Sequence, residues 1–118
     1  MQIKTFFAAF AVLGLLASCA QMERYHPMDM TQAVQSAKTR ADHEALARHY
    51  ENMAQTMQEK MQKHKKLLEQ YEAESYHYGR EAEDLKAHSH ALIRFYEQAA
   101  EANMNMAASH RKMAAEAK

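Results

Sequence analysis

Residues 45–51, Ala-Leu-Ala-Arg-His-Tyr-Glu, and residues 91–97, Ala-Leu-Ile-Arg-Phe-Tyr-Glu, decide the fold. A shift of 46 positions aligns these two segments, and the same shift aligns His64 with His110. Both segments and their surroundings are rich in residues that favour helices. The sequence therefore predicts two copies of one helix, which fold back on each other as an antiparallel hairpin with an approximate internal two-fold axis.

Gly79 is the only glycine after residue 18 and marks the predicted turn, because glycine adopts the left-handed conformation that ends helices. Asp29 is a suitable N-cap for a first helix. Acidic residues follow the glycine, and they suit the positive N-terminal end of a second helix. The sequence predicts an all-α domain over residues 30–118, with helices over 30–76 and 81–116 and a turn near Gly79.

The apolar spacing alternates steps of three and four residues, which is typical of a coiled coil. In the second helix, the predicted contact positions are Leu92, Tyr96, Ala99, Asn103, Met106, His110, Met113 and Ala117. A lone hairpin buries one stripe on each helix and leaves much apolar surface in water. We therefore expect the hairpin to dimerise into a four-helix bundle.

Composition and motifs argue against two function classes. The chain has 15 Lys and Arg residues and 15 Asp and Glu residues, so no basic excess indicates nucleic-acid binding. It contains no G-x-S-x-G motif, no H-E-x-x-H motif and no glycine-rich phosphate loop. A long hairpin also offers no deep pocket for catalysis. We expect a non-enzymatic protein that requires no cofactor.

An apolar run over residues 6–17 follows Lys4 and ends in Leu16-Ala17-Ser18-Cys19. A basic start followed by about 7–15 apolar residues is typical of a secretory signal peptide. The final four residues resemble the lipobox of bacterial lipoproteins. This resemblance implies that residues 1–18 are a signal peptide and that Cys19 carries a diacylglyceryl thioether and a further acyl chain such as palmitate.

The same resemblance gives the expected location. Residues 19–29 would be a lipidated tether, and the domain would lie in the periplasm. Lipoproteins kept in the inner membrane usually have Asp after the lipidated cysteine, whereas this chain has Ala20. The resemblance therefore implies attachment to the periplasmic face of the outer membrane. The expected partners are the membrane, through the lipid, and a second copy of the chain or another envelope protein.

Eight histidines and ten methionines leave a second function open, because imidazole and thioether ligands suit Cu(I). In an antiparallel hairpin turning near Gly79, residues on facing turns of the two helices could form a copper site. The candidate ligands are His49, Met53, Met106 and His110, with Met57 and Met104 close by. On the tether, the candidate ligands are Met22, His26, Met28 and Met30.

A structural role for these residues also stays open, because methionine is a common filler of irregular cores. The same pairing places Tyr50 near His110 and Tyr96 near His64, where tyrosine hydroxyls could hydrogen-bond the histidines. The remaining histidines, His43, His77, His88 and His90, are expected to be exposed or near the turn. The sequence thus predicts an envelope structural or interaction protein, with a copper-binding or copper-buffering lipoprotein as the alternative.

Overall fold

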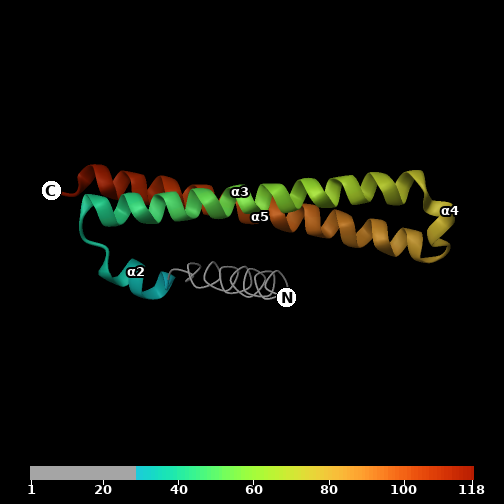
Figure 1. Cartoon of the computed structure of the whole chain (residues 1–118), viewed down its shortest axis with the longest axis horizontal. Helices are drawn as coiled ribbons and strands as arrows, with labels where there is room; N and C mark the ends of the chain where they lie inside the picture. The colour runs from blue at the N-terminus through green and yellow to red at the C-terminus, as the bar shows by residue number, and fades with distance from the viewer. Residues whose placement is uncertain (1–28) are drawn as a thin grey trace, which may run out of the picture. The chain divides into compact units, whose positions relative to one another are not determined.

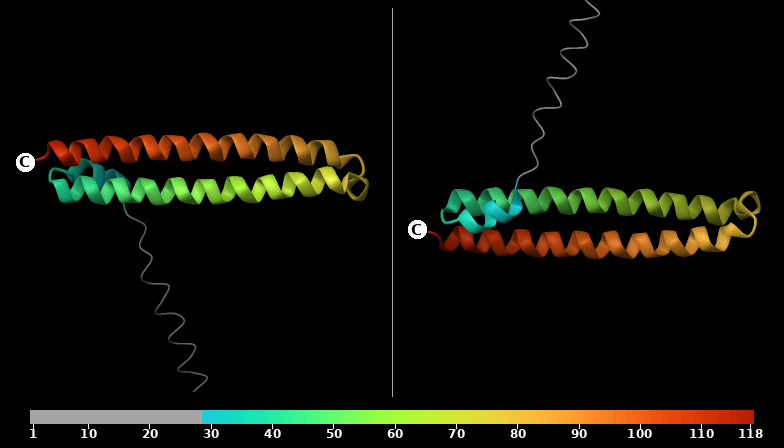
Figure 2. Two further views of the ribbon diagram at one scale, coloured as in Figure 1. Left: turned by 90° about the horizontal axis from the view of Figure 1, so that it is seen from above. Right: turned by 90° about the horizontal axis from the view of Figure 1, so that it is seen from below.

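The computed structural model describes residues 29–118, and it confirms the all-α class, because these residues form helices and no strand. The two long helices, α3 (Arg40–Ala73) and α5 (Glu81–Glu116), lie side by side and run antiparallel (Figures 1 and 2). The short helix α4 (Ser75–Tyr78) joins them at one end. A further short helix, α2 (Met30–Ser36), precedes α3 in the chain.

The segment 30–76, for which the sequence predicts one continuous helix, is divided at residues 37–39. Thr39 is extended, and its hydroxyl oxygen accepts a 3.2 Å hydrogen bond from the backbone N–H of Asp42. The Asp42 carboxylate in turn accepts backbone hydrogen bonds from Lys38 and Thr39, at 3.0 and 2.9 Å. This capping box satisfies amide groups that a helix start leaves unpaired, so α3 starts here.

Removal of this cap gives a first testable expectation. Thr39→Ala should lower the free energy of unfolding by about 1 kcal/mol, because the variant loses the hydroxyl that caps α3. Urea denaturation followed by circular dichroism measures the change. Thr56→Ala is the matched control, since the Thr56 hydroxyl only donates to the Asn52 carbonyl within the exposed helix surface. Equal losses in the two variants would contradict a specific role for the cap.

The turn between the long helices depends on Gly79. Its φ of +57° and ψ of −131° lie outside the conformations that L side chains normally adopt. A Cβ placed on Gly79 would meet no atom within 4 Å, so backbone conformation and not lack of space requires glycine. Tyr78 packs edge-to-face on Tyr71, with ring centroids 5.1 Å apart, and so ties the turn to the end of α3. α5 then starts at Glu81, the predicted residue.

The interface between α3 and α5 is built on small side chains. We call these residues the alanine seam: Ala47 and Ala54 on α3 and Ala100, Ala107 and Ala114 on α5, all of them buried. Small residues at a helix contact let the two axes approach closely, since the distance between packed helices depends on the side chains at the contact. Alanines therefore make up most of the buried apolar residues of the interface.

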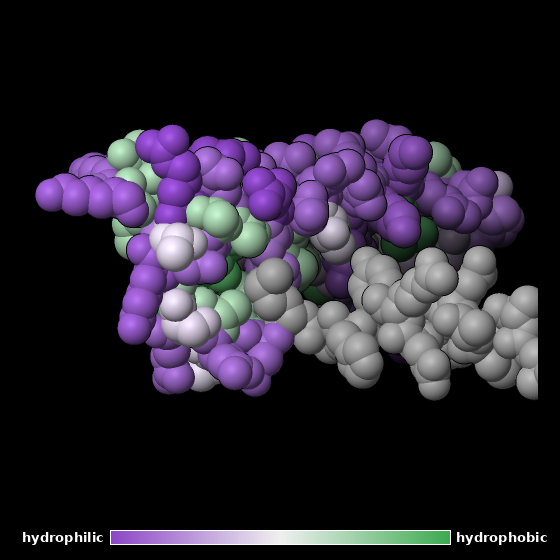
Figure 3. Space-filling view, turned by 60° about the vertical axis from the view of Figure 1, so that its left-hand side comes forward, coloured by the Kyte–Doolittle hydropathy of each residue, from purple (hydrophilic) through white to green (hydrophobic). Residues whose placement is uncertain are grey.

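The predicted contact stripe on α5 is partly wrong for this reason. Tyr96, Asn103, His110 and Ala117 are buried or half-buried, but Met106 is 42% exposed. Leu92, Met106 and Met113 of the predicted stripe are exposed, and so is Phe95, which the prediction left out. We call these four residues the apolar flank. The space-filling view shows hydrophobic side chains emerging among a largely hydrophilic surface (Figure 3).

Candidate functional site

His110 is the buried ionisable residue of the interface. It lies on α5 between Ala107 and Ala114, and only 4% of its surface is exposed. Its ring is nearly parallel to that of Tyr50 on α3, with an interplanar angle of 8° and centroids 5.6 Å apart. Such separations are within the range of favourable aromatic pairs. Two turns of the opposite helix therefore enclose this imidazole.

His43 provides the polar partner of His110. The two Nδ1 atoms are 3.2 Å apart, and the ring centroids are 5.5 Å apart with an interplanar angle of 25°. The difference between these two distances is about two ring radii, so the rings meet nitrogen to nitrogen and not face to face. One Nδ1 must carry the proton and the other must accept it. The two rings are thus joined by an N–H···N hydrogen bond whose donor depends on their tautomers.

A related stack occurs at the equivalent position of the repeat. His64 on α3 lies against Tyr96 on α5, with an interplanar angle of 13° and centroids 5.5 Å apart. The sequence predicts both tyrosine–histidine neighbours, and the structure places both pairs together. The predicted contact was a hydrogen bond from each tyrosine hydroxyl, whereas the described contact is ring against ring. His64 and His110 therefore contact the opposite helix through the faces of their rings. Their ring nitrogens stay available for hydrogen bonds with other groups.

The structure gives each predicted copper ligand its own surroundings, and the predicted convergence of these ligands stays a prediction. His43, which the sequence left among the exposed histidines, takes the position next to the His110 Nδ1. His49 packs edge-on against Tyr50, its neighbour in sequence. Met53 and Met57 are half-buried on α3, while Met104 is exposed on α5. A pairing rule based only on the turn position missed His43, because this contact runs diagonally across the interface.

Charged groups surround the histidine pair on both helices. Arg111 donates two hydrogen bonds to the Glu51 carboxylate, from Nε at 2.9 Å and from Nη2 at 2.8 Å. Arg40 donates from Nε to the Ala114 carbonyl oxygen at 3.2 Å.

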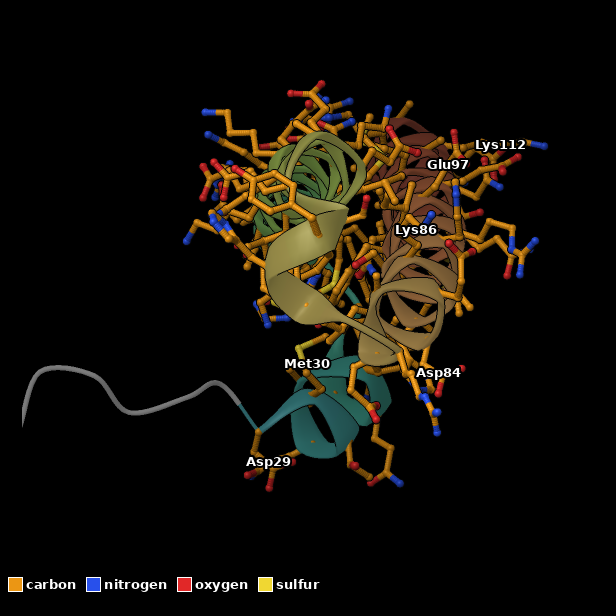
Figure 4. The ribbon with its side chains drawn as sticks, turned by 90° about the vertical axis from the view of Figure 1, so that its right-hand side faces the viewer. Asp29, Met30, Asp84, Lys86, Glu97 and Lys112 are labelled. Carbon is orange, nitrogen blue, oxygen red and sulfur yellow. The ribbon has the colours of Figure 1, made fainter. Side chains whose placement is uncertain are left out.

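The carboxylate of Asp42, whose pKa is about 2 because backbone N–H groups of the cap bind it, adds a negative charge beside His43. Other charged side chains of α5, such as Glu97 and Lys112, point away from α3 (Figure 4).

The buried imidazole makes stability depend on pH. Burial, and secondly the charge of His43, hold the pKa of His110 below its usual value of 6.5. The unfolded chain then binds more protons than the folded chain, so stability is complete above about pH 6.5 and is lost as the pH falls toward the lowered pKa. We expect the urea concentration at the unfolding midpoint to decrease when the pH is lowered from 7.5 to 5.5. In the His110→Gln variant this decrease should be smaller.

Exposed histidine supplies the control for this pH profile. His90 is exposed on α5, so His90→Gln should leave the slope of the profile unchanged. If His110→Gln kept the same pH slope as the unmodified chain, a different group would have to cause the acid sensitivity. Circular dichroism at each pH measures both the midpoint and the helix content.

Part of the predicted site lies outside the described residues, namely Cys19, Met22, His26 and Met28, whereas Met30 begins α2. Over residues 29–118, no helix is both long enough and apolar enough to cross a membrane. Within that same range, no three His, Cys, Asp or Glu side chains converge as ligands for a metal ion.

Comparisons with known proteins leave the family open. No protein-family model matches this chain, and neither the curated proteins nor the solved structures that were searched include a significant match.

Proposed function

We propose that this chain is a lipid-anchored, non-enzymatic helical protein of the bacterial envelope. The proposal joins two features of different origin. The N-terminal sequence supplies the anchor, through the resemblance of Leu16-Ala17-Ser18-Cys19 to a lipobox. The helix pair supplies a long surface for binding another protein. We propose that the first partner of this surface is a second copy of the chain.

The apolar flank is the observation that supports binding. Phe95 is 60% exposed, and Leu92 and Met113 are 37% and 38% exposed. Successive members of the apolar flank are three, eleven and seven residues apart along α5, which are close to whole numbers of helical turns, so they lie along one side of the helix. A protein that buries alanines and exposes phenylalanine and methionine leaves most of its hydrophobic driving force unused within one chain. Exposed apolar side chains that line one side of a helix favour an interaction surface.

A four-helix bundle is the simplest assembly that covers this surface. Two copies that pack through their apolar flanks would bury the large side chains of both α5 helices against each other. A two-fold pairing needs only one surface, because the same residues contact their own counterparts. Each chain would thus contribute its coiled-coil-like helix pair as one half of the four-helix bundle.

Photo-crosslinking in living bacteria tests the interaction. The full chain would carry a photoreactive phenylalanine analogue in place of Phe95, or, as a control, in place of Glu97. Residues two apart on a helix face different directions, and Glu97 points away from α3 (Figure 4). We expect an adduct of twice the chain mass from position 95 alone. An adduct of another mass would replace the dimer by a different envelope protein, and equal products at both positions would refute the surface.

The anchor is tested separately in the same cells. A labelled fatty acid should be incorporated into the full chain and should be lost in Cys19→Ser, because the proposed thioether needs the sulfur atom. Fractionation of the envelope should then place the unmodified chain with the outer membrane. Unchanged labelling in Cys19→Ser would refute lipidation at this residue without affecting the crosslinking result.

A further inference from the structure

We propose that His43 and His110 bind one Cu(I) ion between their Nδ1 atoms, in linear two-coordination, in place of the proton that they share. This inference depends on the geometry of the two rings and not on the function proposed above. It assigns a metal site to a pair of side chains that includes only one of the copper ligands expected from the sequence.

The head-on arrangement of the rings fits this coordination. A linear complex needs two donor atoms whose lone pairs point at each other along one line, and the two Nδ1 atoms meet in this way at 3.2 Å. Imidazole nitrogens bind metal ions at about 2.0–2.1 Å, so the nitrogens would have to separate to about 4 Å. His43 lies in the first turn of α3 and is half-buried, outside the alanine seam, so the separation would have to come from its side chain.

The number of available ligands selects the type of ion. Structural zinc sites use four protein ligands, and catalytic zinc sites use three. Within the described part of the chain, no group of three His, Cys, Asp or Glu side chains is placed to hold a metal ion, so no third ligand of these types is available. Cu(I) is a soft ion for which two nitrogen donors suffice, and imidazole is among its usual ligands.

Two methionines share a side of α5 with His110. Met106 precedes His110 by four residues and Met113 follows it by three, so all three share one side of α5. Both methionines belong to the apolar flank and are partly exposed, whereas His110 is buried. Thioethers bind Cu(I) but not hard cations, so they would favour its approach from solvent over that of calcium or magnesium.

Besides this separation of the two nitrogens, binding requires a change of tautomer. Before binding, one ring carries its proton on Nδ1 and the other ring carries its proton on Nε2. The ion takes the Nδ1 lone pairs of both rings, and the displaced Nδ1 proton passes through water to the Nε2 atom of the same ring. Both imidazoles stay neutral, nothing is oxidised or reduced, and the site gains one positive charge. The nearby Asp42 carboxylate favours that charge, while the Arg40 guanidinium opposes it.

The other half of the helix pair provides an internal comparison. His64 stacks on Tyr96 as His110 stacks on Tyr50. The residue equivalent to His43 is Ser89, whose hydroxyl donates to the Leu85 carbonyl at 2.8 Å. His64 therefore has no imidazole at the corresponding place. The proposal predicts one Cu(I) ion per chain at the His110 end and none at the His64 end.

Competition with a coloured Cu(I) chelator tests the site. The full chain carrying Cys19→Ser, which removes thiol binding, would be titrated in detergent without oxygen. We expect one ion per chain, and X-ray absorption should show two nitrogen neighbours at about 2 Å. His43→Gln should weaken binding by more than about 100-fold, the upper range for losing even an outer-shell partner of a metal ligand. His64→Gln, which removes the equivalent stacked histidine, should leave binding unchanged.

Each other result would overturn the proposal. Equal affinity in the unmodified site and in His43→Gln would place the ion elsewhere, and sulfur neighbours in the absorption spectrum would place it on methionines. Equal losses in His43→Gln and His64→Gln would show a general effect on the helix pair. Absence of stoichiometric binding would exclude the site. If a variant loses helix content, the X-ray absorption spectrum of the chain without that substitution still shows whether two nitrogens bind the ion.

Discussion

Leu46→Ala is expected to lower the free energy of unfolding by about 2–5 kcal/mol, the range for removing a large buried side chain. Leu46 is 2% exposed, and it is the one large apolar side chain among the described residues that is buried. The remaining buried core consists mainly of alanines, which contribute little apolar area each. A large share of the hydrophobic stabilisation of the helix pair therefore depends on this leucine.

Leu92 provides a matched control within the same chain, because it is the repeat equivalent of Leu46. Leu92 is partly exposed as a member of the apolar flank, so Leu92→Ala should cost much less than Leu46→Ala within one chain. Urea denaturation of both variants at one protein concentration measures the difference. Similar losses would mean that an assembly buries the flank, and dilution would then reduce the loss in Leu92→Ala.

Ala107→Leu should be the most disruptive enlargement of a side chain. Ala107 is 1% exposed in the alanine seam, and extra methylene groups in a packed interface typically cost about 1–3 kcal/mol. A two-helix structure has no second layer that could absorb the displacement, so α3 and α5 would have to separate. For a domain of this size, each kcal/mol lowers the melting temperature by about 4–8 °C.

The neighbouring Ala108 separates packing from helix propensity. Ala108 is exposed, and leucine is nearly as good a helix former as alanine, so Ala108→Leu should change stability by less than about 0.5 kcal/mol. Thermal unfolding of the two variants gives the comparison directly. If Ala107→Leu were tolerated as well as Ala108→Leu, close approach of the helices through the alanine seam would be refuted.

Local signals in the sequence were sufficient to predict the turn and the start of α5. Gly79 interrupts an otherwise helix-favouring chain, and acidic residues follow it, so α5 starts where the pattern indicates. The repeat also placed Tyr50 against His110 and Tyr96 against His64, because antiparallel helices that turn at a known residue have a defined register. These features depend on residues close in sequence or on simple symmetry.

The break before α3 and the rotation of the contact stripe could not be predicted, because the sequence is compatible with more than one arrangement at each place. Thr39 and Asp42 form a capping box inside a segment that could equally continue as a helix, so composition alone does not show the break. Apolar spacing gives the period of a contact stripe but not its rotation about the helix axis. Whether Ala107 or Met106 faces the partner depends on how closely the helices approach, which only the packed structure decides.

The two tyrosine–histidine stacks have a consequence for the origin of the fold. Each long helix carries a tyrosine and a histidine in the same order and at the same spacing, and each stack joins the tyrosine of one helix to the histidine of the other. Two copies of such a helix, packed antiparallel, can therefore form both stacks with each other. A single-helix ancestor would have assembled with itself, and linking two copies through a glycine turn would have made that encounter independent of concentration. Two joined copies could then diverge, and His43 in one half and Ser89 in the other would be such a difference.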